Sequence, residues 1–141
     1  MMRSRKGRVI LLIITTIIII AIWGGLTYIP RKIVTIAPSK VSSIKIFDGN
    51  TGKSIIITDK ENIEHIIGNL NGITFKKDKV SLGKMGYSFK TTIYKNSGAV
   101  YKEFMINSTD TIRKDPFFYK DSTKSIDYDY IRNLIDSQKP W

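Results

Sequence analysis

Cysteine is absent from this chain of 141 residues, histidine occurs once and alanine occurs three times. Without cysteine there is no disulfide, no thiolate metal site and no thiol for lipid attachment, so a folded domain must be stable through its core alone. The one histidine, His65, has no visible partner as a metal ligand or as a general base. Apolar runs and charge are therefore the informative features.

The strongest pattern is an aliphatic run near the N-terminus. Residues 9–29 carry no charge, and eleven of the first fourteen are isoleucine, leucine or valine. At about 1.5 Å per residue, a helix of this length spans roughly 31 Å, enough to cross the hydrocarbon core of a bilayer. Each of these aliphatic side chains contributes about −0.3 to −0.6 kcal/mol to insertion, so the run predicts a transmembrane helix over 9–29.

The charges before this run predict its orientation. Residues 1–8 form a basic tail that contains Arg3, Arg5, Lys6 and Arg8. Because positive charges stay on the cytoplasmic side, we expect the N-terminus in the cytoplasm and the following domain outside. Trp23 and Tyr28 then lie at the outer interface, where amphipathic rings are favoured. The alternative is a cleaved signal peptide, which the length of the run and the lack of an A-x-A motif after it do not favour.

The rest of the chain is expected to form one domain close to the bilayer. Residues 30–40 contain Pro38 and show neither helical period nor sustained alternation, so we expect a tether of at most about 33 Å. Residues 41–137 suffice for a single core, and residues 138–141 form a C-terminal tail.

Alternating patterns within 41–137 predict an antiparallel sheet. Apolar and polar residues alternate over 43–46, 87–94 and 100–106, and an isoleucine-rich run covers 54–58. A short strand is expected at 73–77, and a last strand or pair of strands at 111–119, bent at Pro116, which should mark an edge or a bulge. Turn residues at 48–52 and 96–98 join neighbouring strands into antiparallel pairs.

Two helices are expected on one face of this sheet, which makes the fold class α+β. The first carries four aliphatic residues on one side: Ile63, Ile66, Ile67 and Leu70. Thr58 and Glu61 match a capping box at its start, and Gly72 suits a left-handed cap at its end. Asp127 is placed to cap the second helix, whose apolar side holds Tyr130, Ile131, Leu134 and Ile135.

Two residues are candidates for catalysis, and each has a structural alternative. His65 lies about 200° around its helix from Ile63, so it is expected to point toward solvent. Ser81 and Lys84 fit the S-x-x-K spacing of penicillin-recognising enzymes, but S-D-N and K-T-G elements do not accompany them, and Ser81 lies in a glycine-containing loop. We therefore assign no catalytic residue.

The turn at 48–52 is also a candidate calcium loop, since oxygen ligands alternate there and Asp59 stands at the twelfth position. Lys53 occupies the sixth position, where the EF-hand requires glycine, so a hairpin turn is the better interpretation. The sequence predicts no metal site and no cofactor.

Positive charge is the remaining signal. After the apolar run there are 19 lysines and arginines against 12 aspartates and glutamates, with a cluster at Lys76, Lys77, Lys79 and Lys84. Such a cluster can contact lipid headgroups or an anionic polymer, at about 1 kcal/mol for each cation near an anionic surface. Nucleic acid is not an expected partner, because the domain is expected outside and no RNP, zinc or helix-turn-helix pattern is present.

Three segments carry a resemblance: IKIFDGNTGKSIIITDKENIEHIIGNL, GYSFKTTIY and DYDYIRNLI. Over residues 41–136 the chain resembles a small uncharacterised extracytoplasmic domain of clostridia and related Gram-positive bacteria. That domain occurs behind a single membrane anchor and in some proteins is appended to membrane metallopeptidases of the β-lactam-sensor type. The resemblance implies a sensory or binding accessory, and it transfers no catalytic residue, since the H-E-x-x-H motif is absent.

Together these patterns predict a single-pass membrane protein whose outer domain binds another envelope protein or an anionic envelope component without catalysis. Two alternatives stay open, an enzyme that acts on cell-wall material and a scaffold for a membrane complex. The sequence specifies neither the ligand nor the oligomeric state.

Overall fold

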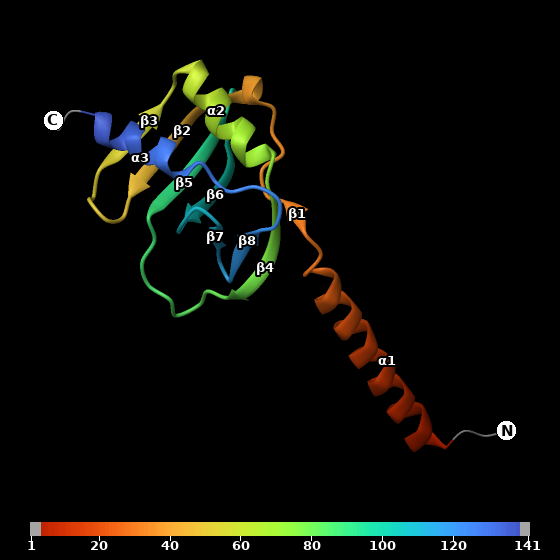
Figure 1. Ribbon diagram of the computed structural model, residues 1–141. Coiled ribbons are helices and arrows are strands. Elements are labelled where there is room, and N and C mark those ends of the chain that lie inside the picture. The colour runs from red at the N-terminus through yellow and green to blue at the C-terminus, as the bar shows by residue number, and fades with distance from the viewer. Residues whose placement is uncertain (1–3, 139–141) are drawn as a thin grey trace.

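The structure, a computed structural model, describes residues 4–138. A long N-terminal helix leads into a domain built from one sheet and two further α-helices (Figure 1). In chain order the elements are α1 (Arg5–Leu26), β1 (Arg31–Lys32), the 3-10 helix η1 (Pro38–Lys40), β2 (Val41–Asp48), β3 (Ser54–Ile57), α2 (Lys60–Asn71), β4 (Thr74–Val80), β5 (Phe89–Lys95), β6 (Val100–Ile106), β7 (Thr111–Lys114), β8 (Phe117–Asp121) and α3 (Tyr128–Ser137).

Within residues 4–138, eight strands form one sheet in the order β1-β4-β8-β7-β6-β5-β2-β3, with β1 and β3 at its edges. Every neighbouring pair is antiparallel, so the α+β class expected from the sequence is confirmed. The sheet has more strands than the patterns indicated. The strand that the patterns did not indicate is β1, which spans two residues, too few for any alternation. β7 and β8, of four and five residues, are the pair that was one of the two expectations for 111–119.

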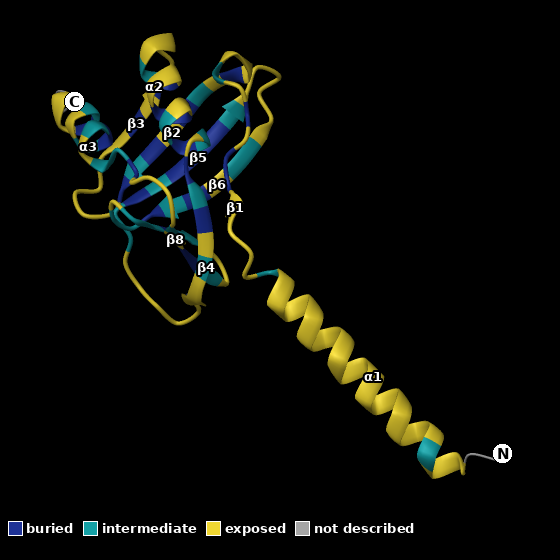
Figure 2. Ribbon diagram, turned by 45° about the vertical axis from the view of Figure 1, so that its right-hand side comes forward, coloured by how far each residue is buried: buried dark blue, intermediate teal, exposed yellow. Residues whose placement is uncertain are grey.

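One face of the sheet is buried beneath α2 and α3. Ile44 of β2 lies opposite Ile57 of β3 and Ile93 of β5, so these three side chains point to the same face. They join one cluster with the buried residues of the two helices: Ile63, Ile66, Ile67, Leu70, Ile131 and Ile135. Figure 2 shows the buried positions alternating along the strands. Each such side chain stabilises the fold by about 1.5–3 kcal/mol, which is how a domain without disulfides remains folded.

The segment 30–40, expected as a tether, packs against the domain in the structure. Arg31 and Lys32 form β1, which pairs with Phe75 and Thr74 of β4. Three following aliphatic residues are buried in the core: Ile33, Val34 and Ile36. A strand of two residues leaves no period in the sequence, so this addition to the sheet could not be seen from alternation.

Two helix ends differ from the expected caps. The N-cap of α2 is Asp59, whose carboxylate accepts a hydrogen bond from the Asn62 N–H at 3.0 Å, one residue later than the expected Thr58. Gly72 ends α2 with φ of −78°, so its conformation is right-handed and not the left-handed cap expected. Asp127 is the N-cap of α3, but its side chain makes no capping bond.

Pro116 lies at neither a sheet edge nor a bulge. It follows a cis peptide bond in the turn between β7 and β8, and both of those strands have neighbours on both sides. The expectation failed because the proline was assigned to a strand, where it would lack a ladder donor, whereas a tight turn needs none from it.

α1 runs from Arg5 to Leu26, so it begins before and ends before the expected 9–29. Ser4 caps it by accepting a hydrogen bond from the Gly7 N–H at 3.2 Å. The hydroxyls of Thr15 and Thr16 donate to carbonyls one turn earlier, both at 2.8 Å, which satisfies these polar groups inside an apolar helix. α1 is long and apolar enough to cross a membrane, and a helix this close to the N-terminus is also compatible with a signal sequence.

Candidate functional site

The junction between α1 and the sheet is held by one lysine. The Lys77 ammonium donates a hydrogen bond to the Thr27 hydroxyl at 2.9 Å and lies 3.9 Å from the centre of the Phe117 ring. It also lies 5.2 Å from the centre of the Tyr28 ring. Lys77 therefore connects the residues that follow α1 to β4 and β8.

The structure does not gather the four lysines of the expected basic cluster on one surface. Lys76 stands opposite Lys120 on the sheet face away from α2 and α3, whereas Lys77 lies on the other face at the α1 junction. Lys79 and Lys84 are exposed at and after the end of β4. None of these other three lysines makes the contacts that hold Lys77.

The residues expected to flank the membrane lie at the two ends of α1. Arg5, Lys6 and Arg8 are exposed at its N-terminal end, while Arg3 lies outside the described residues. Trp23 and Tyr28 are exposed at its C-terminal end, where α1 meets the domain.

Ser81 is buried and its hydroxyl donates a hydrogen bond to the Asp115 carboxylate at 2.6 Å. Asp115 also accepts a bond from the Arg113 Nε at 2.7 Å, and these donors hold the pKa of the Asp115 carboxyl below its usual range, the arginine being the larger cause. Ser81 and Lys84 lie in a loop and not on a helix. Ser81 thus anchors the end of β4 to the β7–β8 turn.

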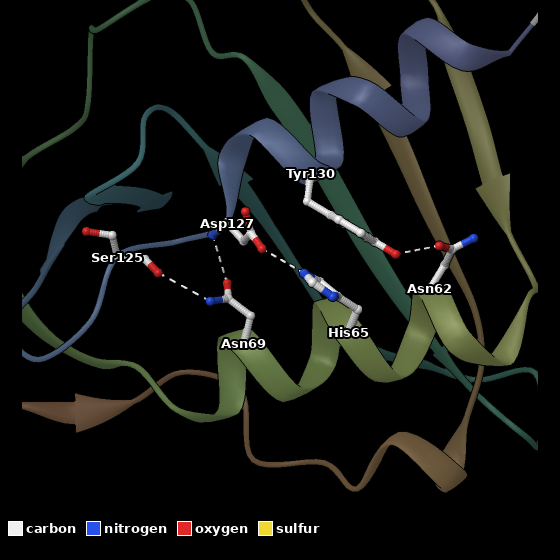
Figure 3. Close-up of polar contacts among 6 residues, drawn as sticks. All are labelled: Asn62, His65, Asn69, Ser125, Asp127 and Tyr130. Atoms are coloured by element: carbon white, nitrogen blue, oxygen red, sulfur yellow. Dashed lines mark hydrogen bonds and ion pairs between the residues drawn. The ribbon is translucent and has the colours of Figure 1, made fainter.

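His65, expected to face solvent without a partner, has two partners on α3 and its N-cap (Figure 3). Its Nε2 lies 2.7 Å from the Asp127 carboxylate, and its ring stacks on Tyr130 with the ring centres 3.6 Å apart. The Tyr130 hydroxyl donates to the Asn62 side chain at 2.6 Å. The imidazole is half exposed, so the expected exposure holds in part while the isolation does not.

Asn69 extends this contact. Its side-chain oxygen accepts the Asp127 backbone N–H at 2.9 Å, and its amide donates to the Ser125 carbonyl at 3.3 Å. Asn62, His65 and Asn69 are spaced by three and four along α2, so one side of this helix carries a polar seam that binds the start of α3. The pKa of the Tyr130 hydroxyl is raised, first by burial and then by the negative charges of Glu61, Asp59 and Asp127. The hydroxyl therefore stays protonated and can donate its hydrogen bond to Asn62.

A histidine paired with an aspartate is the arrangement of an acid–base dyad, so this place is the candidate site for chemistry. It borders an open surface depression of about 370 Å³ that includes Asn69, Lys124 and Ser125. Within residues 4–138 no group of three or more histidine, aspartate or glutamate side chains is arranged to hold a metal ion. Its hydrogen bond and ring stacking join α2 to α3, so a structural role is enough to explain why His65 and Asp127 lie together.

The second candidate site is the sheet face that α2 and α3 leave uncovered, which we call the open face. One row across it is formed by Ile56, Lys45, Thr92 and Glu103 on adjacent strands. The next row is formed by Phe47, Lys90, Met105 and Arg113. Ile56 is 66% exposed, and Lys90 pairs with Glu103 at 3.3 Å. The open face therefore combines apolar, aromatic and charged side chains of both signs.

Comparison with protein-family models, with curated proteins and with solved structures finds no match for this chain. The case for a function therefore depends on the geometry of its own residues.

Proposed function

We propose that this chain is a single-pass membrane protein, anchored by α1 with its N-terminus in the cytoplasm, whose outer domain binds another protein of the cell envelope through the open face. The domain acts as a binding or sensory accessory and not as an enzyme. The observation that carries this proposal is the exposure of Ile56 on the edge strand β3 of that face.

The anchoring rests on the surface of α1. Its aliphatic side chains are exposed on every side of the helix, from Val9 to Leu26. An apolar surface of this extent is stable in lipid and costly in water. The basic residues at the N-terminal end favour the cytoplasm for that end. The resemblance to domains that stand behind a single anchor supports the same arrangement.

The choice of a protein partner rests on the composition of the open face. An anionic polymer would favour a surface of unopposed lysines, but Lys90 is paired with Glu103 on this face. Exposed isoleucine together with Phe47 and Met105 is instead typical of the centre of a protein interface, where aromatic residues and methionine are enriched. Ile56 lies on β3, which is a short edge strand of the sheet.

The enzyme alternative depends on His65 and Ser81, and their surroundings favour structural roles. The hydroxyl of Ser81 is buried against Asp115, and the ring of His65 is stacked on Tyr130. Their elements are also separate, since α2 lies at the top of the domain in Figure 1 and the loop after β4 lies at the bottom.

Site-specific cross-linking in cells tests the proposed function. A photo-cross-linking amino acid placed at Lys45 lies on the open face beside Ile56, and the matched control replaces Glu64, an exposed residue of α2. We expect a discrete cross-linked protein from position 45 but not from position 64. Adding Ile56→Glu should remove it without changing the amount of folded domain. Equal cross-linking at both positions, or cross-linking at position 45 that survives Ile56→Glu, would contradict the proposal.

A further inference from the structure

The last residue of β4 and the loop between β4 and β5 expose apolar side chains that the core does not use. Val80 is 53% exposed, Leu82 is 64% exposed and Met85 is 98% exposed. Three such residues within six positions form a local apolar projection, and in water their exposure is unfavourable. Neither the fold nor the proposed protein-binding face accounts for them.

The backbone of this loop is held in place. Ser81 donates its N–H to the Pro116 carbonyl at 2.8 Å and its hydroxyl to Asp115 at 2.6 Å. Arg113 donates from Nη1 to the Lys84 carbonyl at 2.8 Å. These polar contacts bind the loop to the β7–β8 turn, so the apolar side chains are left pointing away from the domain.

The register of the sheet places this loop at the level of the C-terminal end of α1, the end nearest the domain. β1 leaves α1 and pairs antiparallel with β4, so β4 runs back toward the helix, and Lys77 contacts Thr27 at 2.9 Å. β4 then continues for three residues to Val80, about 10 Å further at 3.3 Å per residue. In Figure 1 the loop forms the lower end of the domain, the end from which α1 leaves.

Three lysines flank the apolar projection, and the nearby Asp115 carboxylate is paired with Arg113. Lys79 precedes it, Lys84 lies within it, and Lys114 stands at the adjacent β7–β8 turn, all three exposed. Apolar tips flanked by lysine suit the boundary between acyl chains and anionic headgroups, where each side chain meets the environment it favours.

We propose that the β4–β5 loop inserts into the surface of the same bilayer that α1 spans. Leu82 and Met85 contact the acyl chains, while Lys79 and Lys84 contact anionic headgroups. The inference rests on the membrane anchoring in the proposed function and adds a second attachment. With two attachments the domain has a fixed tilt, and the open face has a fixed direction relative to the membrane.

A fluorescent probe on the loop tests this inference in the full chain. Because the sequence has no cysteine, Met85→Cys labels one position, and Glu64→Cys on α2 is the matched control. Each labelled chain is reconstituted in vesicles of phosphatidylcholine with phosphatidylglycerol, and in a second set whose acyl chains carry bromine as a quencher. We expect the probe at position 85 to be shifted to the blue and quenched by the brominated lipid, and the probe at position 64 to remain as in water.

Flotation of the same vesicles separates the two claims. A chain that fails to float with the vesicles contradicts the membrane anchoring itself. A chain that floats while its probe at position 85 matches the probe at position 64 contradicts the loop inference alone. With Lys79→Gln and Lys84→Gln, the ratio of inserted to free loop should fall about thirtyfold in the anionic vesicles, whereas an unchanged ratio would overturn the headgroup contact.

Discussion

Isoleucine has opposite surroundings in the two parts of this molecule. The eight isoleucines of α1 are 49–65% exposed, whereas sixteen of the seventeen from Ile33 onward are at most 8% exposed. The exception in the domain is Ile56. Exposed isoleucine is unfavourable in water, so this contrast supports the proposal that α1 lies in an apolar environment. The same comparison singles out Ile56, which is why we propose it as a position that a partner covers.

The largest expected effect is the loss of membrane attachment when α1 is made polar. Ile14→Arg together with Ile18→Arg adds about 5–7 kcal/mol to the cost of insertion, which cancels the gain from the aliphatic residues. The chain should then leave the membrane pellet in alkaline carbonate, while the matched pair Ile14→Leu and Ile18→Leu should stay. Retention of the arginine variant in the pellet would show that something other than lipid covers the exposed isoleucines of α1.

Truncating one isoleucine in each part should give very different results: a large loss of stability for the domain isoleucine and almost none for the helix isoleucine. Ile67 of α2 is fully buried, so Ile67→Ala should lower the free energy of unfolding by about 2–5 kcal/mol. Ile18→Ala in α1 should change it by less than about 0.5 kcal/mol. Urea unfolding of the full chain in detergent, followed by near-ultraviolet circular dichroism, measures both. Equal losses in the two variants would contradict the separation between helix and domain.

The domain core also buries one carboxylate, Asp48, whose charge gives the domain a pH dependence that the apolar helix α1 does not have. Asp48 is fully buried, and burial alone would raise the pKa of its carboxyl. The carboxylate accepts hydrogen bonds from the Asn50 N–H and the Thr51 hydroxyl, both at 2.8 Å, and these hold its pKa below the usual 3.8. A lowered pKa stabilises the fold above pH 3.8, and this stability is lost as the pH falls through the folded-state value. Asp48→Asn should cost about 1 kcal/mol at pH 7 and flatten the stability curve below pH 4.

Unfolding curves from pH 7 to pH 2 measure that difference. The control Asp78→Asn removes an exposed carboxylate of β4 and should change the stability at pH 7 by less than about 0.5 kcal/mol. If the chain with Asp48→Asn lost as much stability in acid as the unchanged chain, Asp48 would not be the source of the acid dependence.

The smallest effect on stability is expected at Ile56. A glutamate there would stand opposite Lys45, so Ile56→Glu should change the free energy of unfolding by less than about 0.5 kcal/mol. Its neighbour Ile55 is buried, and Ile55→Glu would place a charge in the core at a cost of several kcal/mol. Thermal unfolding of both variants measures the contrast. A large loss from Ile56→Glu would mean that Ile56 supports the fold and is not reserved for a partner.

The sequence predicted those elements whose residues repeat with a clear period. The four aliphatic positions of α2 and the strand β6 are confirmed, because each has enough residues to show its spacing. β1 was missed because it has only two residues and is specified by pairing with β4. For the same reason the burial of Ile33 and Val34 could not be foreseen.

The surroundings of His65 could be anticipated only in part. Asn62 and Asn69 stand three residues before it and four after it, a spacing that indicates a polar seam on one side of α2. Asp127 is 62 residues away, and only the packing of α3 against α2 brings it to His65. The contact of Ser81 with Asp115 likewise depends on the β7–β8 turn. Contacts between distant segments leave no local pattern.

The most direct test of the membrane arrangement is labelling of single cysteines with a membrane-impermeant maleimide. Ser97→Cys lies in the exposed β5–β6 turn of the domain, and Ser4→Cys lies at the start of α1. The account predicts labelling at position 97 in intact cells and at position 4 only after the membrane is permeabilised. Labelling at position 4 alone, or a domain released into the medium without α1, would contradict it.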